Sequence, residues 1–209
     1  MDYSAAGNTF RVAESETREV PPHLDGLLLL QNFRLRVINR DGSEAASCGN
    51  GLRCIGRYLL DTGHPRGRYA IQTGDRTVTV HCFDEIGVDL GAPRDYKQHA
   101  HFDFVNTGVP HLVLWVDSLD FEIEPLAHPL RMQWDANVNF ALRGDPIRVR
   151  TYERGVGETL SCGTGAAAVA YSAHRRFQTP FPIQLSFRGG LLRIEPGLTL
   201  FGDVKRLYI

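Results

Sequence analysis

The chain has 209 residues, of which 43% are hydrophobic and 22% are charged, so it is long enough to bury a substantial core and has an ordinary globular composition. Its net charge of -1 excludes a general electrostatic preference for nucleic acid or for an anionic membrane. No apolar run is long enough to span a bilayer, and the start MDYSAAGNTF lacks the features of a signal peptide. We therefore expect a cytoplasmic protein whose four cysteines are thiols, because they are too few for a disulfide scaffold.

The first half of the chain is predicted to form strands around one helix. Apolar and polar residues alternate at 33–37, which predicts a strand that runs into a polar turn. A helix is expected over about 50–61, where apolar side chains recur at helical spacing and Gly63 can end the helix. Residues 70–91 alternate again, with turn signals between the apolar runs, and this pattern indicates further strands.

The second half repeats this order of elements. Residues 104–116 have the pattern of an interrupted buried strand, and a second alternating strand is expected at 147–151. A second helix is expected over about 164–177, where a run of alanines ends in cations that suit a helix C-terminus. Residues 182–196 predict a hairpin with two glycines at its turn.

Two cysteine-containing segments align without gaps: residues 33–51 (FRLRVINRDGSEAASCGNG) and residues 147–165 (IRVRTYERGVGETLSCGTG). Every pair is offset by 114 positions, and eight of the 19 pairs are identical, where chance gives about one. Each segment holds a strand, a turn, a Cys-Gly-x-Gly motif and the start of a helix. The chain therefore contains an internal repeat with one cysteine in each copy.

The repeat predicts an α+β fold of two α/β halves related by a pseudo-twofold axis. Each half is expected to be a curved, mostly antiparallel sheet around a central helix, with the active site in the cleft between the halves. A polar, proline-containing stretch at 91–101 indicates their boundary. We expect an N-terminal half of residues 1–93 and a C-terminal half of residues 94–198, and the closing strand at 199–209 is free to return to the first half.

Both cysteines immediately precede a predicted helix, where unpaired backbone N–H groups gather. Such a position binds anions and favours thiolate over thiol, so we expect a lowered pKa for each cysteine. Two thiols on opposite sides of one small carboxylate suit the removal of a proton from one face of a stereocentre and its return to the other face. No pyridoxal-phosphate motif and no zinc spacing is present, so we expect neither cofactor nor metal.

The motifs NRDGSEAASCGNGLRC and YERGVGETLSCGTGAAA resemble the two active-site signatures of the diaminopimelate epimerase family. The resemblance extends to Gly7-Asn8, to the segment GVPHLVLWVD and to residues 136–140, so it spans most of the chain. It implies a cofactor-independent isomerase that interconverts LL- and meso-diaminopimelate on the route to lysine and peptidoglycan. Proline racemase relatives share the fold, but the Glu-Arg-Gly-x-Gly-Glu-Thr approach to the second cysteine favours the epimerase branch.

The resemblance implies that Cys48 and Cys162 are the acid/base pair. The substrate contacts that it implies are Gly49, Asn50, Gly163 and Thr164 at the α-carboxylate, Glu153 at the α-ammonium, and Asn8, Asn39, Asn137 and Arg154 along the pocket, with Arg154 and the asparagines at the distal carboxylate. His111 is expected beside one thiol. Several of these residues also have an ordinary structural interpretation, as a turn or cap asparagine, an exposed ion pair or a core histidine.

The chain departs from the family pattern in the walls around the predicted substrate. It is short before Cys48, Gly26 stands where the family often has a glutamine, and Val109 stands where an asparagine is common, which leaves Asn106 as the nearest substitute. These departures leave open a racemase for another amino acid. A redox or binding protein that works through a Cys48–Cys162 disulfide is the alternative outside enzymes. The expected partner is a small amino acid, and a homodimer is left open.

Overall fold

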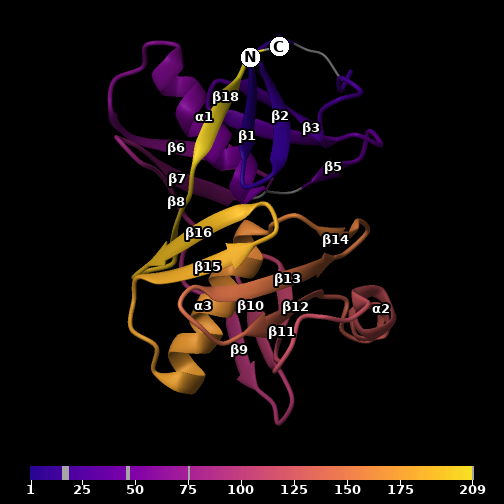
Figure 1. Ribbon diagram of the computed structural model, residues 1–209. Coiled ribbons are helices and arrows are strands. Elements are labelled where there is room, and N and C mark those ends of the chain that lie inside the picture. Colours follow the sequence, from indigo (N-terminus) through magenta and orange to yellow (C-terminus); the bar gives the residue numbers. More distant parts are fainter. Residues whose placement is uncertain (16–18, 46–47, 75, 209) are drawn as a thin grey trace. The chain divides into compact units, whose positions relative to one another are not determined.

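The structure, a computed structural model, describes residues 1–15, 19–45, 48–74 and 76–208 (Figure 1). The chain divides into two compact units, which we call unit 1 (Met1–Asp89 with Phe201–Ile209) and unit 2 (Leu90–Leu200). Each unit combines strands with a helix that follows one of the two repeat cysteines, so the mixed α/β character is confirmed. In the part of the chain that the structure describes, no helix has the length and apolar character needed to cross a membrane.

The elements of each unit follow the chain in order. Unit 1 contains β1 (Asp2–Ala5), β2 (Asn8–Ala13), β3 (Gly26–Gln31), β4 (Arg34–Asn39), β5 (Glu44–Ala45), α1 (Gly49–Asp61), β6 (Gly67–Thr73), β7 (Arg76–Cys82), β8 (Ile86–Asp89) and β18 (Val204–Leu207). Unit 2 contains β9 (Asp95–Gln98), β10 (Asp103–Asn106), β11 (Pro110–Trp115), α2 (Ile123–Trp134), β12 (Asn137–Leu142), β13 (Ile147–Glu153), β14 (Gly157–Thr159), α3 (Gly163–Phe177), β15 (Ile183–Phe187) and β16 (Gly190–Glu195). Strand β17 (Thr199–Phe201) spans the sequence boundary between the units.

The strands of the two units pair in the same order. In unit 1, β2 is parallel to β3, β3 is antiparallel to β4, and β4 is parallel to β6 across α1. In unit 2, the same relations join β11 to β12, β12 to β13, and β13 to β15 across α3. The hairpins β4–β5, β6–β7, β13–β14 and β15–β16 are antiparallel. The internal repeat of the sequence is therefore a repeat of topology.

The central helix of each unit packs closely on its sheet because small residues face the strands. A Cβ added at Gly56 in α1 would lie 2.6 Å from Ile86 Cγ2 and 2.9 Å from Val80 Cγ1, which is too close for any larger residue. The alanines of α3 that are fully buried are Ala166, Ala167, Ala168, Ala170 and Ala173. The helices predicted at 50–61 and 164–177 correspond to α1 and α3.

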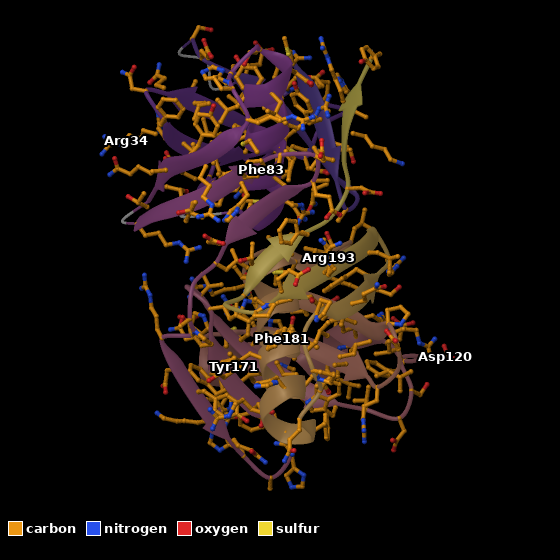
Figure 2. All side chains as sticks on the ribbon, turned by 90° about the vertical axis from the view of Figure 1, so that its left-hand side faces the viewer. Arg34, Phe83, Asp120, Tyr171, Phe181 and Arg193 are labelled. Carbon is orange, nitrogen blue, oxygen red and sulfur yellow. The ribbon has the colours of Figure 1, made fainter. Side chains whose placement is uncertain are left out.

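An arginine and a glutamate that are identical in the two repeats form the same ion pair in each unit. Arg36 donates two hydrogen bonds to the Glu44 carboxylate, at 3.0 and 2.9 Å. Arg150 donates two to the Glu158 carboxylate, at 2.7 and 3.0 Å. Each pair closes the hairpin that leads into a cysteine motif. By contrast Arg34, which is also identical in both repeats, extends from β4 into solvent (Figure 2).

Helix α2 is not predicted by the sequence. It contains Pro129 in its interior and begins after Glu122, which makes no side-chain capping hydrogen bond. Its position is set by packing, because the helix contributes two residues to a buried apolar cluster: Leu112, Ile123, Ala127, Ala136, Val138, Phe140 and Tyr152. In unit 1, the described residues between β2 and β3 (14–15 and 19–25) contain no helix.

The interrupted strand predicted at 104–116 is two antiparallel strands. Strand β10 turns at Gly108, whose φ of 104° favours glycine, and β11 returns beside it with Asn106 opposite Pro110. This turn brings His111 of β11 next to Asn137 of β12, because those two strands run parallel in register.

We expect Arg150→Met to reduce the free energy of unfolding more than Arg36→Met. Besides Glu158, Arg150 donates to the backbone oxygens of Leu119 and Phe121, both at 2.7 Å, whereas the Arg36 ion pair is more exposed. Exposed ion pairs contribute up to about 1 kcal/mol, and hydrogen bonds from a charged group about 1.5 to 3 kcal/mol. Urea unfolding of the two variants measures the difference. An equal loss of unfolding free energy in both would contradict the larger contribution of Arg150.

Candidate active site

Cys48 occupies the N-cap of α1 with an extended backbone, at φ -143° and ψ 111°. Its Sγ accepts a hydrogen bond from the backbone N–H of Gly51 at 3.3 Å. A Cβ at Gly51 would lie 2.8 Å from the Leu28 side chain, so only glycine lets this turn of the helix approach β3. The first half of the predicted site is therefore a half-buried sulfur held against backbone amides.

Two of the predicted substrate-binding asparagines meet beside Cys48. Asn50 is 2% exposed, and its Nδ2 donates to Asn8 Oδ1 at 2.6 Å. Gly49, the other predicted residue at this helix start, is also buried. Asn39 ends β4, and its side chain donates to Ser43 Oγ at 3.0 Å in the following turn. The structure thus joins Asn8 and Asn50 directly, while Asn39 bonds within its own turn.

Cys162 occupies the equivalent N-cap of α3, at φ -133° and ψ 116°, but its surroundings differ. Only 6% of the residue is exposed, and it makes no capping hydrogen bond of the kind that Cys48 makes. The Thr164 hydroxyl lies 3.5 Å from Cys162 Sγ. Gly163 and Thr164 form the first turn of α3, and Thr107 Oγ1 donates to the Thr164 carbonyl at 3.0 Å.

Glu153 lies beside Cys162 and changes its acidity. The Glu153 carboxylate accepts a hydrogen bond from Thr159 Oγ1 at 2.7 Å and interacts with the Cys162 thiol. Burial raises the pKa of Cys162 well above its usual value, and the negative charge of Glu153 raises it further. The lowered pKa predicted from the helix start is therefore wrong for Cys162, because burial and Glu153 outweigh Thr164 and the Gly165 amide, which favour the thiolate. Burial also raises the pKa of Glu153 itself.

His111 reaches Cys162 through Thr164. The imidazole is fully buried in β11, and its Nε2 lies 3.0 Å from Thr164 Oγ1. Its Nδ1 lies 3.1 Å from the side-chain nitrogen of Asn139. Burial lowers the pKa of His111 to about 3, so the ring is neutral at physiological pH.

The remaining predicted residues of unit 2 lie near the end of β13. Asn137 Oδ1 accepts a hydrogen bond from the backbone N–H of Arg154 at 2.8 Å. The Arg154 guanidinium lies 2.9 Å from Asp135 Oδ2, and the two side chains are 45% and 72% exposed. Asn106 Oδ1 accepts from the Gly108 N–H at 3.0 Å within the β10–β11 turn. The structure therefore fixes the Arg154 backbone and leaves its side chain in an exposed ion pair.

Comparison with known proteins identifies the family of the chain. The sequence model of the family described as "Diaminopimelate epimerase" matches residues 4–95 and 104–196. The chain belongs to the diaminopimelate epimerase family. It is 42% identical to the diaminopimelate epimerase of Archaeoglobus fulgidus over 82% of this chain and 73% of that protein. It is 34% identical to that of Thermotoga maritima over 99% of this chain and 98% of that one.

A solved structure shows the same fold at low sequence identity. A predicted epimerase from Pseudomonas aeruginosa superposes with a TM-score of 0.73, covering 99% of this chain and 96% of that chain, at 13% identity. That likeness establishes the fold alone. All four cysteines of this diaminopimelate epimerase family member are free thiols, including Cys48 and Cys162.

Sequence reasoning missed three residues that bear on the two cysteines. Asn139 and Thr107 position the second half of the site, and a buried asparagine two places from Asn137 could have signalled this, because alternate residues of a strand face the same side. Arg53 in α1 is fully buried, and within the described residues its guanidinium nitrogens have no hydrogen-bond partner. Burial lowers its pKa to about 10, an effect that Cys54, Cys48 and Asp203 oppose.

The packing around Gly26 leaves no room for a side chain. A Cβ at this position would lie 2.8 Å from the backbone oxygen of Ile38 and 3.3 Å from the Phe10 ring. Gly26 also pairs with Asn39 in the β3–β4 ladder. A glutamine at this position could not be accommodated without a backbone shift in this diaminopimelate epimerase family member.

We expect Glu153→Gln to lower the pKa of Cys162. The variant removes the negative charge that helps to raise this pKa, so the pH midpoint for alkylation of Cys162 should fall by about one unit or more. Iodoacetamide labelling followed by peptide mass spectrometry measures this midpoint. Glu158→Gln is the matched control, because that carboxylate pairs with Arg150. An unchanged midpoint in Glu153→Gln would contradict the electrostatic role.

Proposed function

We propose that this chain interconverts LL- and meso-diaminopimelate without a cofactor, with Cys48 and Cys162 as the acid/base pair. The observation that carries the proposal is the repeat of topology, which puts one cysteine at the N-cap of α1 and another at the N-cap of α3. Membership of the diaminopimelate epimerase family supports the substrate and the reaction. The reaction serves lysine and peptidoglycan synthesis.

The proposed reaction moves one proton off and one proton on to the same carbon. One sulfur, as the thiolate, takes the α-hydrogen and becomes a thiol. The electron pair left behind delocalises into the substrate carboxylate, which backbone amides at a helix start stabilise. The other thiol then donates its proton to the opposite face and becomes a thiolate. The reverse reaction exchanges the two roles, so no external oxidant or reductant is needed.

The substrate contacts follow from the residues around each sulfur. Gly49, Asn50, Gly163 and Thr164 supply the amides and polar side chains for the α-carboxylate. Glu153, whose pKa burial raises, suits the α-ammonium group because it is a carboxylate next to Cys162. Asn8, Asn39, Asn137 and Arg154 are assigned to the pocket, with Arg154 on the distal carboxylate. The exposed Arg154–Asp135 ion pair contributes little, so a substrate carboxylate can replace it.

A racemase for a different amino acid is the second candidate. The observation that favours it is the packing at Gly26, where a glutamine cannot fit without a backbone shift. Val109 also stands where the family commonly has an asparagine, and Asn106 uses its side-chain oxygen within the turn. Proton NMR of amino-acid mixtures in D₂O separates the two candidates, because α-deuterium appears only in the true substrate. Cytoplasmic localisation and a homodimer stay predictions.

We expect Cys48→Ala and Cys162→Ala each to abolish epimerisation while leaving the fold intact. Each variant removes one obligatory proton carrier and only a small side chain. Chiral chromatography of the diaminopimelate isomers measures turnover, and circular dichroism measures folding. Cys82→Ala, which removes a buried cysteine outside both motifs, controls for general loss of thiols. Near wild-type turnover in either active-site variant would exclude the two-thiol mechanism.

We expect Arg154→Lys to weaken activity on diaminopimelate by about ten- to a hundredfold in kcat/KM, the equivalent of a charge-assisted bond of about 1.5 to 3 kcal/mol. A lysine cannot reproduce the two-pronged contact of a guanidinium with a carboxylate. The kcat/KM for amino acids without a second carboxylate should fall little. Arg40→Lys is the matched control, since Arg40 is the repeat partner and bonds to the Leu24 carbonyl. An equal loss of kcat/KM on every substrate would mean that Arg154 does not contact the distal carboxylate.

A further inference from the structure

A buried polar chain runs across three strands of unit 2 to the start of α3. Asn139 lies on β12, opposite Thr151 of β13 and opposite Val113 of β11. Asn139, His111 and Thr151 are fully buried. A Cβ at Gly165 would lie 2.6 Å from Asn139 Oδ1, so the helix approaches this asparagine as closely as a glycine permits. Each polar atom in such a place needs a partner.

The orientation of the Asn139 amide is determined by a group that can only accept. Asn139 Nδ2 lies 2.9 Å from the backbone oxygen of Leu112, so the nitrogen and not the oxygen must face that carbonyl. The amide oxygen then faces Thr151 Oγ1, which donates to it at 2.9 Å. The second hydrogen of Nδ2 is left for His111 Nδ1, at 3.1 Å.

The amide determines in turn which nitrogen of His111 carries the proton. Because Asn139 donates to Nδ1, that nitrogen is an acceptor and holds no hydrogen. A neutral imidazole with a bare Nδ1 carries its proton on Nε2. Nε2 therefore donates to Thr164 Oγ1 at 3.0 Å. Since Thr164 Oγ1 accepts this bond, its own hydrogen is available for the Cys162 sulfur, 3.5 Å away.

We propose that Asn139 is a positioning residue, which holds His111 in the Nε2–H tautomer so that a one-way chain of hydrogen bonds ends on the Cys162 sulfur. The order of donors is Asn139 amide, His111 imidazole, Thr164 hydroxyl and Cys162 Sγ. The chain stabilises the thiolate form of Cys162 during the half of the cycle in which that sulfur is the base. It also excludes His111 as the base that deprotonates Cys162, because Nε2 already carries a proton. The catalytic meaning rests on the proposed function, whereas the tautomer does not.

This chain of hydrogen bonds favours the Cys162 thiolate, against the groups that raise the pKa of Cys162. Glu153 on β13 faces the sulfur with a negative charge, and burial disfavours the thiolate. Thr164 and the Gly165 amide, both on α3, act in the opposite direction. His111 on β11 is kept neutral by burial, so it contributes an oriented N–H dipole and no net charge. Without a fixed tautomer, the Thr164 hydroxyl could turn to a bare Nε2 and leave the sulfur with the Gly165 amide but no hydroxyl donor.

The first experiment reads the tautomer directly in the wild-type protein. Long-range proton–nitrogen correlation spectra of nitrogen-15 histidine-labelled protein distinguish Nε2–H, Nδ1–H and imidazolium rings. His111→Gln identifies the His111 signals among the eight histidines. We expect a neutral Nε2–H ring at neutral pH that stays neutral well below the usual histidine range. A ring protonated on Nδ1, or an imidazolium, would overturn the inference.

The second experiment tests whether Asn139 sets the direction and whether Cys162 feels it. Asn139→Ala should introduce the Nδ1–H tautomer and raise the alkylation midpoint of Cys162 by about half to one pH unit, part of the effect of a hydrogen bond to a charged atom. Thr164→Val should raise it by about one unit or more on the same basis. Thr151→Val is the matched control, because it leaves the Asn139 contacts to Leu112 and His111 in place and should change neither readout.

A double variant and an activity assay complete the test. If Asn139 acts through Thr164, Asn139→Ala in a Thr164→Val background should add no further shift, and an additive shift would overturn the chain. An unchanged tautomer and midpoint in folded Asn139→Ala would overturn it as well. None of these readouts needs turnover. If the protein shows the tautomer and the pH shifts but does not epimerise diaminopimelate, the proposed function is disproved and this inference stands.

Discussion

In both units a cysteine holds the N-cap of a helix, where backbone N–H groups lack partners within the helix. The surrounding chain builds this position. An ion-paired hairpin leads into each cysteine, and a glycine in the next turn leaves no room for a Cβ, against Leu28 at Gly51 and against Asn139 at Gly165. This close packing fixes the backbone of each helix start, and with it the position of the cysteine and its neighbouring amides.

The N-cap cysteine has different surroundings in the two units. Cys48 is half-buried, receives the Gly51 amide and lies within electrostatic reach of the buried Arg53 guanidinium. Cys162 is buried beside the Glu153 carboxylate, with the Thr164 hydroxyl 3.5 Å from its sulfur. The neighbouring charges therefore differ in sign at the two sulfurs. Two cysteines at equivalent N-caps therefore lie in different electrostatic surroundings.

The residues that would recognise the far end of a substrate are less constrained than those at the cysteines. Asn137 fixes the backbone of Arg154, but the guanidinium sits in an exposed ion pair with Asp135 that is easily exchanged. At Gly26, a Cβ would meet the Ile38 backbone oxygen, so a glutamine could not be accommodated without a backbone shift. We therefore predict that changes in this wall alter substrate choice without disturbing either helix start.

The sequence by itself determined the repeat, the two helices α1 and α3 and the N-cap place of each cysteine, because spacing, glycines and caps act within a few residues. Tertiary structure decided the rest. Helix α2 forms around Pro129 through packing, and Cys162 has a raised pKa because β13 brings Glu153 beside it in a buried place. The chain from Asn139 through His111 joins β11, β12 and α3, so only the register of those strands and the docking of that helix bring its atoms together.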